Sequence, residues 1–196
     1  MTKLVTIFGG SGFIGRYIAH RMAKQGWRVR VAVRRPNEAI FVKTYGVVGQ
    51  VEPILCNIRD DASVGEALRG ADAVVNCVGI LIEDKKNTFA AVQQGGAERI
   101  GRLSTELGIK SLVHISAIGA DENSSSIYSS TKAKGENAIV SNFPNAVILR
   151  PSIVFGQEDQ FFNRFAKMAT MAPVLPLVGA NTRFQPVFVD DVAKAA

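Results

Sequence analysis

The first fifteen residues of this chain join an apolar run to a glycine-rich turn. The run, Leu4 to Phe8, leads into Gly9-Gly10-Ser11-Gly12-Phe13-Ile14-Gly15, and apolar residues then recur at helical spacing through Ile18 and Met22. We interpret this pattern as a buried strand, a tight turn and a helix. Such a turn presents backbone N–H groups and the positive end of a helix macrodipole to a pyrophosphate. The segment therefore predicts a dinucleotide-binding site.

The glycines of this turn have separate expected roles. Gly9 and Gly10 allow the tight turn, Gly12 lets the backbone approach a phosphate, and Gly15 brings the helix close to the sheet. An ordinary strand-to-helix turn can carry a similar pattern, but the flanking strand and helix favour the dinucleotide. The cofactor contacts expected from this segment are Gly9, Ser11, Gly12, Phe13, Ile14 and Gly15.

Strand-like and helix-like segments alternate as far as Leu149. The predicted strands are Leu4–Phe8, Trp27–Val33, Val51–Leu55, Ala73–Cys77, Ser111–Ile115 and Ala146–Leu149. Between them, helices are predicted up to Gln25 and over Pro36–Tyr45, Ala62–Leu68, Phe89–Leu107 and Tyr128–Ser141. Repeated strand and helix units predict an α/β fold, a Rossmann-type doubly wound parallel sheet with helices on both faces and the ligand at the carboxyl ends of the strands.

From Arg150 onward this alternation stops. An apolar amphipathic segment, Phe161–Met171, follows, and Asp190 or Asp191 is expected to be the N-cap of a last helix. We therefore expect a dinucleotide-binding domain at residues 1–155 and the beginning of a small C-terminal substrate-side region at residues 156–196. A helix that starts so close to Ala196 suggests that this second region is incomplete.

Composition limits the class of protein. The chain has 196 residues, of which 47% are hydrophobic, which is enough for one main core. No apolar run is long enough for a transmembrane segment and no secretory signal pattern is present, so an intracellular, cytoplasmic protein is expected.

The net charge of +6 is concentrated before residue 46. A basic end of this kind can steer a phosphorylated ligand or attract an acidic partner or a membrane surface. Aromatic residues are not interleaved with the cations as in nucleic-acid-binding surfaces, so nucleic acid is not an expected partner.

The cysteines and histidines predict neither a disulfide nor a metal site. Cys56 and Cys77 follow strands that are expected to lie three strand spacings apart, roughly 14 Å. We therefore expect reduced core thiols. His20 and His114 have no partners at metal-ligand spacing.

Two arginines stand where dinucleotide sites usually carry an acidic residue. Arg34 and Arg35 end the second predicted strand, about twenty residues after the glycine turn. Guanidinium groups bind a ribose 2′-phosphate, which a carboxylate would repel, so NADP(H) is the preferred cofactor and NAD(H) the alternative. Surface charges beside Glu38 are the other explanation. Asn57 and Ile58 follow the third strand and are expected near the adenine, whose edge Asn57 could hydrogen-bond.

Tyr128 and Lys132 lie four residues apart at the start of a predicted helix. Residues at this spacing share a helix face, so the phenol and the ammonium are expected to point into one cleft. A nearby ammonium lowers the pKa of a phenol and can hold a cofactor ribose, which makes the tyrosine a usable general acid. A surface pair formed by chance is the alternative.

These motifs together resemble the short-chain dehydrogenase/reductase superfamily over essentially the whole chain. The matching segments are Gly9-x-x-Gly12-x-x-Gly15, Asn76-Cys77-Val78-Gly79, Ser116, Tyr128-x-x-x-Lys132 and Leu149-Arg150-Pro151-Ser152-x-x-Phe155-Gly156. The resemblance implies catalytic roles for Tyr128, Lys132 and Ser116. It also implies cofactor contacts from Cys77, Val78, Gly79, Lys132, Pro151, Ser152 and Ile153, the last three beside the nicotinamide.

Four segments are similar to the atypical subfamily that contains the nucleotide-binding accessory subunit of respiratory complex I and its bacterial relatives. They are Val78–Leu81, His114–Asp121, Phe155–Ala166 and Phe184–Val192. This resemblance implies that NADPH is a structural or regulatory ligand. It also implies that complex I, or another protein assembly at the membrane surface, is the partner, which would place the protein at the periphery of the inner membrane.

One departure from the enzyme pattern concerns Ser116. It is followed by Ala117 and Ile118, where superfamily enzymes commonly carry further hydroxyl residues, so the substrate-orienting hydroxyl is expected to be absent or misplaced. Two other functions stay open: a free-standing oxidoreductase or epimerase that uses Tyr128 as acid or base, and a regulator that senses the NADP⁺/NADPH ratio. The Phe161–Met171 segment would contact a partner or membrane surface in the first interpretation and form the floor of a substrate cleft in the enzyme.

Overall fold

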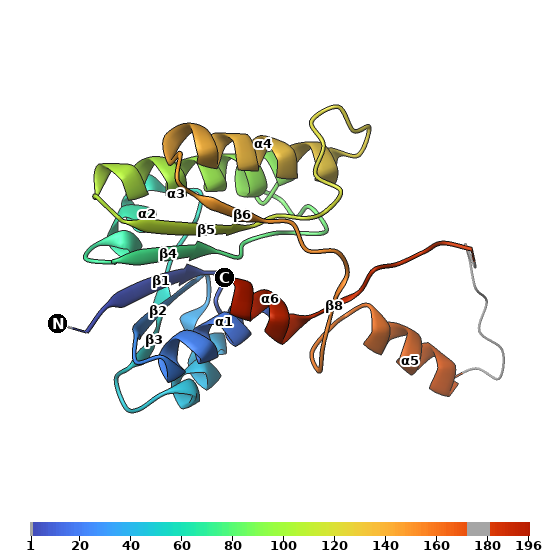
Figure 1. Cartoon of the computed structure of the whole chain (residues 1–196), viewed down its shortest axis with the longest axis horizontal. Helices are drawn as coiled ribbons and strands as arrows, with labels where there is room; N and C mark the ends of the chain where they lie inside the picture. The colour runs from blue at the N-terminus through green and yellow to red at the C-terminus, as the bar shows by residue number, and fades with distance from the viewer. Residues whose placement is uncertain (1, 172–180) are drawn as a thin grey trace.

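A computed structural model of the chain describes residues 2–171 and 181–196. Its centre is a six-stranded parallel sheet with the strand order β3-β2-β1-β4-β5-β6 (Figure 1). The strands are β1 (Leu4–Phe8), β2 (Arg28–Val33), β3 (Val51–Leu55), β4 (Ala73–Asn76), β5 (Ser111–Ile115) and β6 (Val147–Leu149). The chain reverses its direction of winding between β1 and β4, which is the topology of doubly wound dinucleotide-binding sheets. The predicted fold class is confirmed.

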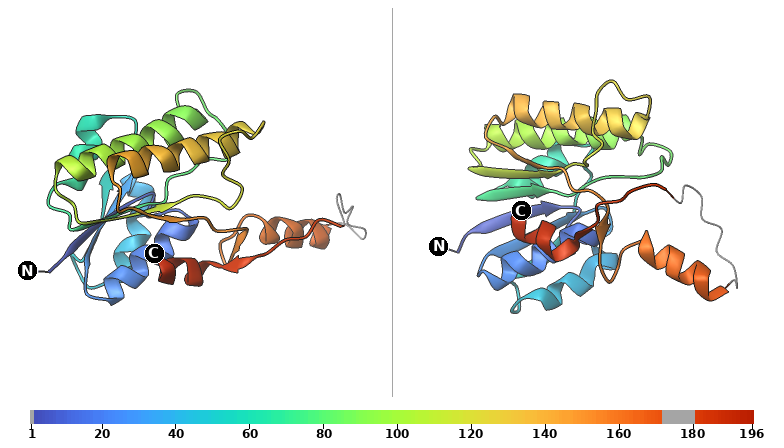
Figure 2. Two further views of the ribbon diagram at one scale, coloured as in Figure 1. Left: turned by 45° about the horizontal axis from the view of Figure 1, so that its top comes forward. Right: turned by 45° about the vertical axis from the view of Figure 1, so that its right-hand side comes forward.

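Helices cover both faces of this sheet (Figure 2). On one face lie α1 (Phe13–Lys24), the 3₁₀ segment η1 (Pro36–Tyr45) and α6 (Val189–Ala195); on the other lie α2 (Asp61–Leu68), α3 (Gly95–Glu106) and α4 (Ile127–Asn142). Side chains alternate along each strand, so both cores are supplied by the same strands. Ile7 and Val75 pack on the α1 face, whereas Phe8 and Val74 pack on the opposite one.

The predicted helix Phe89–Leu107 is present, but it is not α-helical throughout. It starts with a π-helical stretch, η2 (Ala90–Gln94), which is followed by α3. Two contacts from outside the helix lie at this stretch. The side-chain amide of Gln93 donates to the carbonyl of Ile80 at 2.8 Å, and Gly135 of α4 approaches so closely that a Cβ there would lie 2.4 Å from the Gln93 carbonyl oxygen. These contacts hold the wider turn in place.

The predicted N-cap of the last helix is wrong. Helix α6 starts at Val189, with Phe188 as its N-cap. Asp190 lies inside the first turn and accepts a hydrogen bond from Arg21 Nε of α1 at 2.6 Å. The side chain that seemed free to cap a helix is therefore used to dock α6 against α1.

A C-terminal arm extends from the carboxyl end of the sheet (Figure 1). We define the arm as α5 (Phe162–Met171) and the return segment, residues 181–188, which ends in β8 (Val187–Phe188). Strand β8 pairs in parallel with β7 (Val154–Phe155). Among the described residues, no helix combines the length and the apolarity needed to cross a membrane.

The base of the arm is fixed by two carboxylates. Asp159 is buried and accepts hydrogen bonds from the backbone N–H groups of Phe162 at 2.7 Å and Asn163 at 3.3 Å, which starts α5. Glu158 accepts a hydrogen bond from the Tyr17 hydroxyl at 2.7 Å and pairs with Arg16 at 3.6 Å. The base of the arm therefore contacts α1, the helix that follows the glycine turn.

Candidate functional site

A cavity of about 540 Å³ lies at the carboxyl ends of β1, β2, β3 and β4. Open α/β sheets bind their ligands at this position, where the winding reverses. Ten residues that were predicted from separate parts of the sequence line it together: Gly9, Ser11, Gly12, Arg34, Arg35, Asn57, Ile58, Cys77, Val78 and Gly79.

The glycine turn leaves the start of α1 open. Gly9 has a φ of 73°, which favours glycine, and Gly12 is the N-cap without a side-chain hydrogen bond to the helix. The first turn of α1 contains no acidic residue, so its positive dipole is not neutralised from within. A Cβ on Gly15 would lie 2.3 Å from the Gly9 carbonyl oxygen. The sequence predicted that Gly15 brings the helix close to the sheet. The closest atoms to Gly15 belong instead to the turn, at Gly9 and Gly10.

Charges of both signs meet at the end of β2. Arg34 and Arg35 line the cavity, and so does Glu38, which pairs with Arg35 at 3.1 Å. Arg35 and Glu38 are largely exposed. Within residues 2–171 and 181–196, no carboxylate lies at ion-pair distance from Arg34.

Sequence reasoning missed part of the cavity wall. The further lining residues are Phe8, Ala32, Val33, Glu38, Cys56, Arg59, Ile80, Asp84, Asn87 and Val92. Phe8 and Val33 are the last residues of predicted strands and Cys56 follows another, so their position could have been inferred from the expected parallel sheet. Asp84 and Asn87 pair with each other in the loop after β4, and no local sequence signal places them at the cavity.

The other predicted cofactor contacts lie outside this cavity. Phe13, Ile14 and Gly15 form the first turn of α1, where Ile14 packs against the core. Pro151 and Ser152 line a second groove of about 450 Å³, together with part of the return segment and of α6. The carbonyl of Ile153 accepts a hydrogen bond from Val187 N at 2.9 Å.

Tyr128 and Lys132 share α4 but point to different partners. The Lys132 ammonium is buried and donates to the Ile115 carbonyl at 2.8 Å. The Tyr128 ring packs edge-on against Phe89 at 6.0 Å between ring centres. Burial raises the pKa of Tyr128. The expected lowering of this pKa by Lys132 is wrong, because the ammonium is directed at the end of β5.

His114 lies on β5, and Ser116 lies just beyond the end of this strand. Ser116 is buried and its Oγ has no hydrogen-bond partner among the described residues. His114 Nδ1 lies 3.0 Å from the side-chain amide nitrogen of Asn76, which can only donate. His114 Nδ1 is therefore the acceptor, and the imidazole ring is neutral. Burial lowers the pKa of His114 to about 3. Asn76 Oδ1 accepts from Val78 N at 3.0 Å, so this pair positions a stretch of the cavity wall.

The buried ammonium makes a testable contribution to stability. Burial lowers the pKa of Lys132 to about 8, whereas an unfolded lysine titrates at about 10.4. Between these values the unfolded chain binds more protons, so the contribution of Lys132 to stability increases as the pH rises. We expect the difference in unfolding free energy, wild type minus Lys132→Met, to increase by about 3 kcal/mol between about pH 7 and pH 11 in urea titrations. The tyrosines and cysteines also titrate in this pH range, but they are present in both proteins and largely cancel in the difference. A difference in unfolding free energy that stays constant with pH would contradict a lowered pKa of Lys132.

Comparisons with known proteins agree with this geometry. The model of the NAD dependent epimerase/dehydratase family matches residues 5–196. The NADH-ubiquinone oxidoreductase 40 kDa subunit, mitochondrial, of Neurospora crassa is 35% identical over 97% of this chain and 50% of its own length. A ceramide reductase of Caulobacter vibrioides is 28% identical over 97% of the chain and 58% of its own length. The chain therefore spans about half the length of these relatives.

A solved structure shows the same fold. The Bordetella bronchiseptica enzyme WbmH in complex with NAD⁺ superposes with a TM-score of 0.81 and 17% sequence identity, over 100% of this chain and 71% of its own. The parallel sheet reverses its winding between β1 and β4, and a glycine turn precedes α1. Because the family model also covers nearly every residue, this chain is a member of the NAD dependent epimerase/dehydratase family.

Proposed function

We propose that this chain binds NADP(H) in the 540 Å³ cavity, with the pyrophosphate at the first turn of α1. The observation that carries this proposal is the start of α1, which has no side-chain cap and follows a glycine turn with little space for a Cβ at Gly10, Gly12 or Gly15. The volume is in the range of cofactor sites. Arg34 and Arg35 supply guanidinium groups for a 2′-phosphate, and Asn57 and Ile58 border the adenosine half.

We further propose that the nucleotide is a structural or regulatory ligand within a larger protein assembly, such as respiratory complex I at the periphery of the inner membrane. The similarity to the Neurospora subunit supports this role. The contacts of Lys132 and Tyr128, the candidate catalytic residues, support this role as well. The Lys132 ammonium is already engaged by a backbone carbonyl, and the raised pKa of Tyr128 makes its phenol a weaker acid near neutral pH.

A free-standing reductase is the second candidate. It is favoured by Ser116, whose buried Oγ has no hydrogen-bond partner among the described residues. Tyr128 and Lys132 are present on the neighbouring helix, and the Caulobacter relative is named as a reductase.

Nucleotide content tests the proposed NADP(H) site, and turnover distinguishes these two functions. We expect the purified protein to contain about one NADP(H) per chain by mass spectrometry, and to oxidise NADPH with a panel of ketones no faster than its Tyr128→Phe variant does. Turnover that falls a hundredfold or more in Tyr128→Phe, the usual size of an acid–base contribution, would instead establish the reductase. Tyr45→Phe is the control, because Tyr45 lies in η1 on the other face of the sheet.

A further inference from the structure

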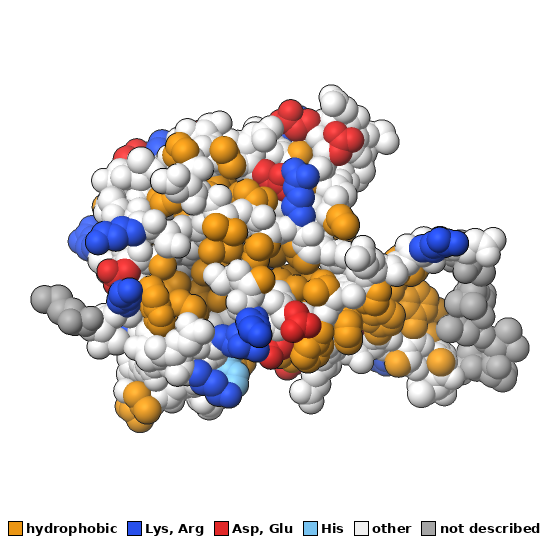
Figure 3. All heavy atoms as spheres, in the orientation of Figure 1, with side chains coloured by type: hydrophobic (Ala, Val, Ile, Leu, Met, Phe, Trp, Pro, Cys, Tyr) orange, Lys and Arg blue, Asp and Glu red, His pale blue; other side chains and the backbone are white. Residues whose placement is uncertain are grey.

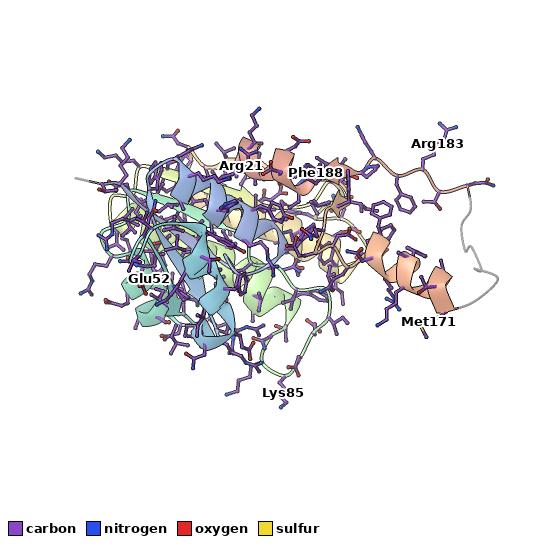
Figure 4. The ribbon with its side chains drawn as sticks, turned by 90° about the horizontal axis from the view of Figure 1, so that it is seen from below. Arg21, Glu52, Lys85, Met171, Arg183 and Phe188 are labelled. Carbon is purple, nitrogen blue, oxygen red and sulfur yellow. The ribbon has the colours of Figure 1, made fainter. Side chains whose placement is uncertain are left out.

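The arm has an unusual charge distribution. Between Asp159 and Asp190 the sequence contains no acidic residue, whereas it contains the cations Arg164, Lys167 and Arg183. All three of these side chains are exposed. Figure 4 labels Arg183 on the return segment and Met171 at the end of α5.

Helix α5 has two distinct sides. At about 100° per residue, Phe162, Phe165 and Met168 fall on one side together with two alanines. Asn163, Arg164, Lys167 and Thr170 fall on the other side, together with the exposed Met171 at the end of the helix. A helix of a globular protein normally buries its apolar side. Here no residue of α5 is buried, and Phe162 and Phe165 are 41% and 38% exposed.

Aromatic contacts hold the two parts of the arm together. The Phe161 ring lies 5.3 Å from that of Phe165 and 5.6 Å from that of Phe184 on the return segment, measured between ring centres. Phe184 and Phe188 are themselves exposed. The arm therefore presents a preformed apolar surface, and Figure 3 shows hydrophobic side chains gathered along it.

We propose that the arm docks on the surface of a lipid bilayer that contains anionic lipids. The apolar side of α5 would enter the boundary between headgroups and acyl chains, and Arg164, Lys167 and Arg183 would interact with lipid phosphates. The charge pattern favours this occupant over an ordinary protein partner, because a surface with phenylalanines, cations and no carboxylates is complementary to a negatively charged interface. This inference goes beyond nucleotide binding and does not depend on it.

The test is co-sedimentation of the full chain with vesicles of phosphatidylcholine, alone or with about a third of phosphatidylglycerol. We expect binding to the anionic vesicles and little binding to the neutral ones. The double variant Arg164→Gln/Lys167→Gln should bind the anionic vesicles about thirtyfold more weakly. Phe162→Ser/Phe165→Ser should lose binding as well. The control Arg28→Gln/Lys110→Gln removes two exposed cations at the amino ends of β2 and β5 and should bind like the wild type.

Three results of the vesicle experiment would overturn the proposal. They are equal binding to both kinds of vesicle, the same loss in the control as in the arm variants, and binding that survives both arm substitutions. Self-association that depends on Phe162 and Phe165, seen by sedimentation velocity without lipid, would assign the surface to a second copy instead. Arg164 and Lys167 are exposed, so Arg164→Gln/Lys167→Gln should unfold like the wild type and keep its NADPH affinity. Phe162→Ser/Phe165→Ser also loses ring contacts with Phe155 and Phe161, so its urea unfolding is measured beside its binding. Failure here is thus separate from failure of the nucleotide site.

Discussion

Gly15→Ala is expected to abolish dinucleotide binding and to destabilise the protein. The added Cβ would lie 2.3 Å from the Gly9 carbonyl oxygen and 2.7 Å from the Gly10 Cα. Both are backbone atoms, so the turn itself must move. The Gly9 carbonyl also accepts the hydrogen bond from Gly12 N at 2.9 Å, so its displacement would disturb the whole turn.

The expected size of this effect follows from two separate costs. Forcing a methyl group into a filled space costs about 1–3 kcal/mol of unfolding free energy, measurable in urea. Loss of aligned N–H groups to a charged phosphate costs about 1.5–3 kcal/mol for each bond, so we expect NADPH affinity by calorimetry to fall at least about a hundredfold.

Gly65→Ala is the matched control. Gly65 lies in the middle of α2, and no atom lies within 4 Å of its added Cβ. Helix propensity predicts a gain of up to about 1 kcal/mol in stability, and NADPH binding should not change. A Gly15→Ala protein that binds NADPH like the wild type would show that the pyrophosphate is not held at the start of α1.

The double variant Arg34→Ala/Arg35→Ala is expected to reverse the preference for NADPH over NADH. Two charge-assisted contacts to the 2′-phosphate would be lost, so NADPH affinity should fall at least about a hundredfold, while NADH affinity stays nearly constant. Of the single variants, Arg34→Ala should have the larger effect, because Arg35 is shared with Glu38. Titration of both dinucleotides by calorimetry measures the ratio.

Two further variants make this experiment specific. Glu38→Gln removes the carboxylate beside Arg35 and should strengthen NADPH binding. Arg28→Ala removes an exposed cation at the opposite end of β2 and should leave both affinities unchanged. If the NADPH to NADH ratio in Arg34→Ala/Arg35→Ala equalled that of the wild type, these arginines would be surface charges.

Local sequence patterns were sufficient for the sheet and for most of the cavity. Glycines mark the ends of strands and helices, and Gly26, Gly70 and Gly108 adopt the positive φ that such ends require. Most predicted boundaries therefore lie within one residue of those observed. Parallel strands bring their carboxyl ends to one edge, which is why residues as distant in sequence as Gly9 and Gly79 could be placed in one site.

The errors come from contacts between residues that are far apart in the sequence. The turn at Gln93 depends on Ile80 and Gly135, and the role of Asp190 depends on Arg21. The partner of Lys132 is a backbone carbonyl, which no side-chain pattern reveals. Helical spacing correctly put Tyr128 and Lys132 on one helix, but it contains no information about what each side chain meets.

The two thiols of the cavity wall have a chemical consequence. Cys56 and Cys77 lie three strands apart, at the ends of β3 and β4, and both line the cavity. Burial raises the pKa of Cys56 and raises that of Cys77 to about 12. The reactive form of cysteine is the thiolate, so neither sulfur is an effective nucleophile while the protein is folded. A ligand with an electrophilic group is therefore expected to alkylate Cys56 and Cys77 only slowly when it occupies this cavity.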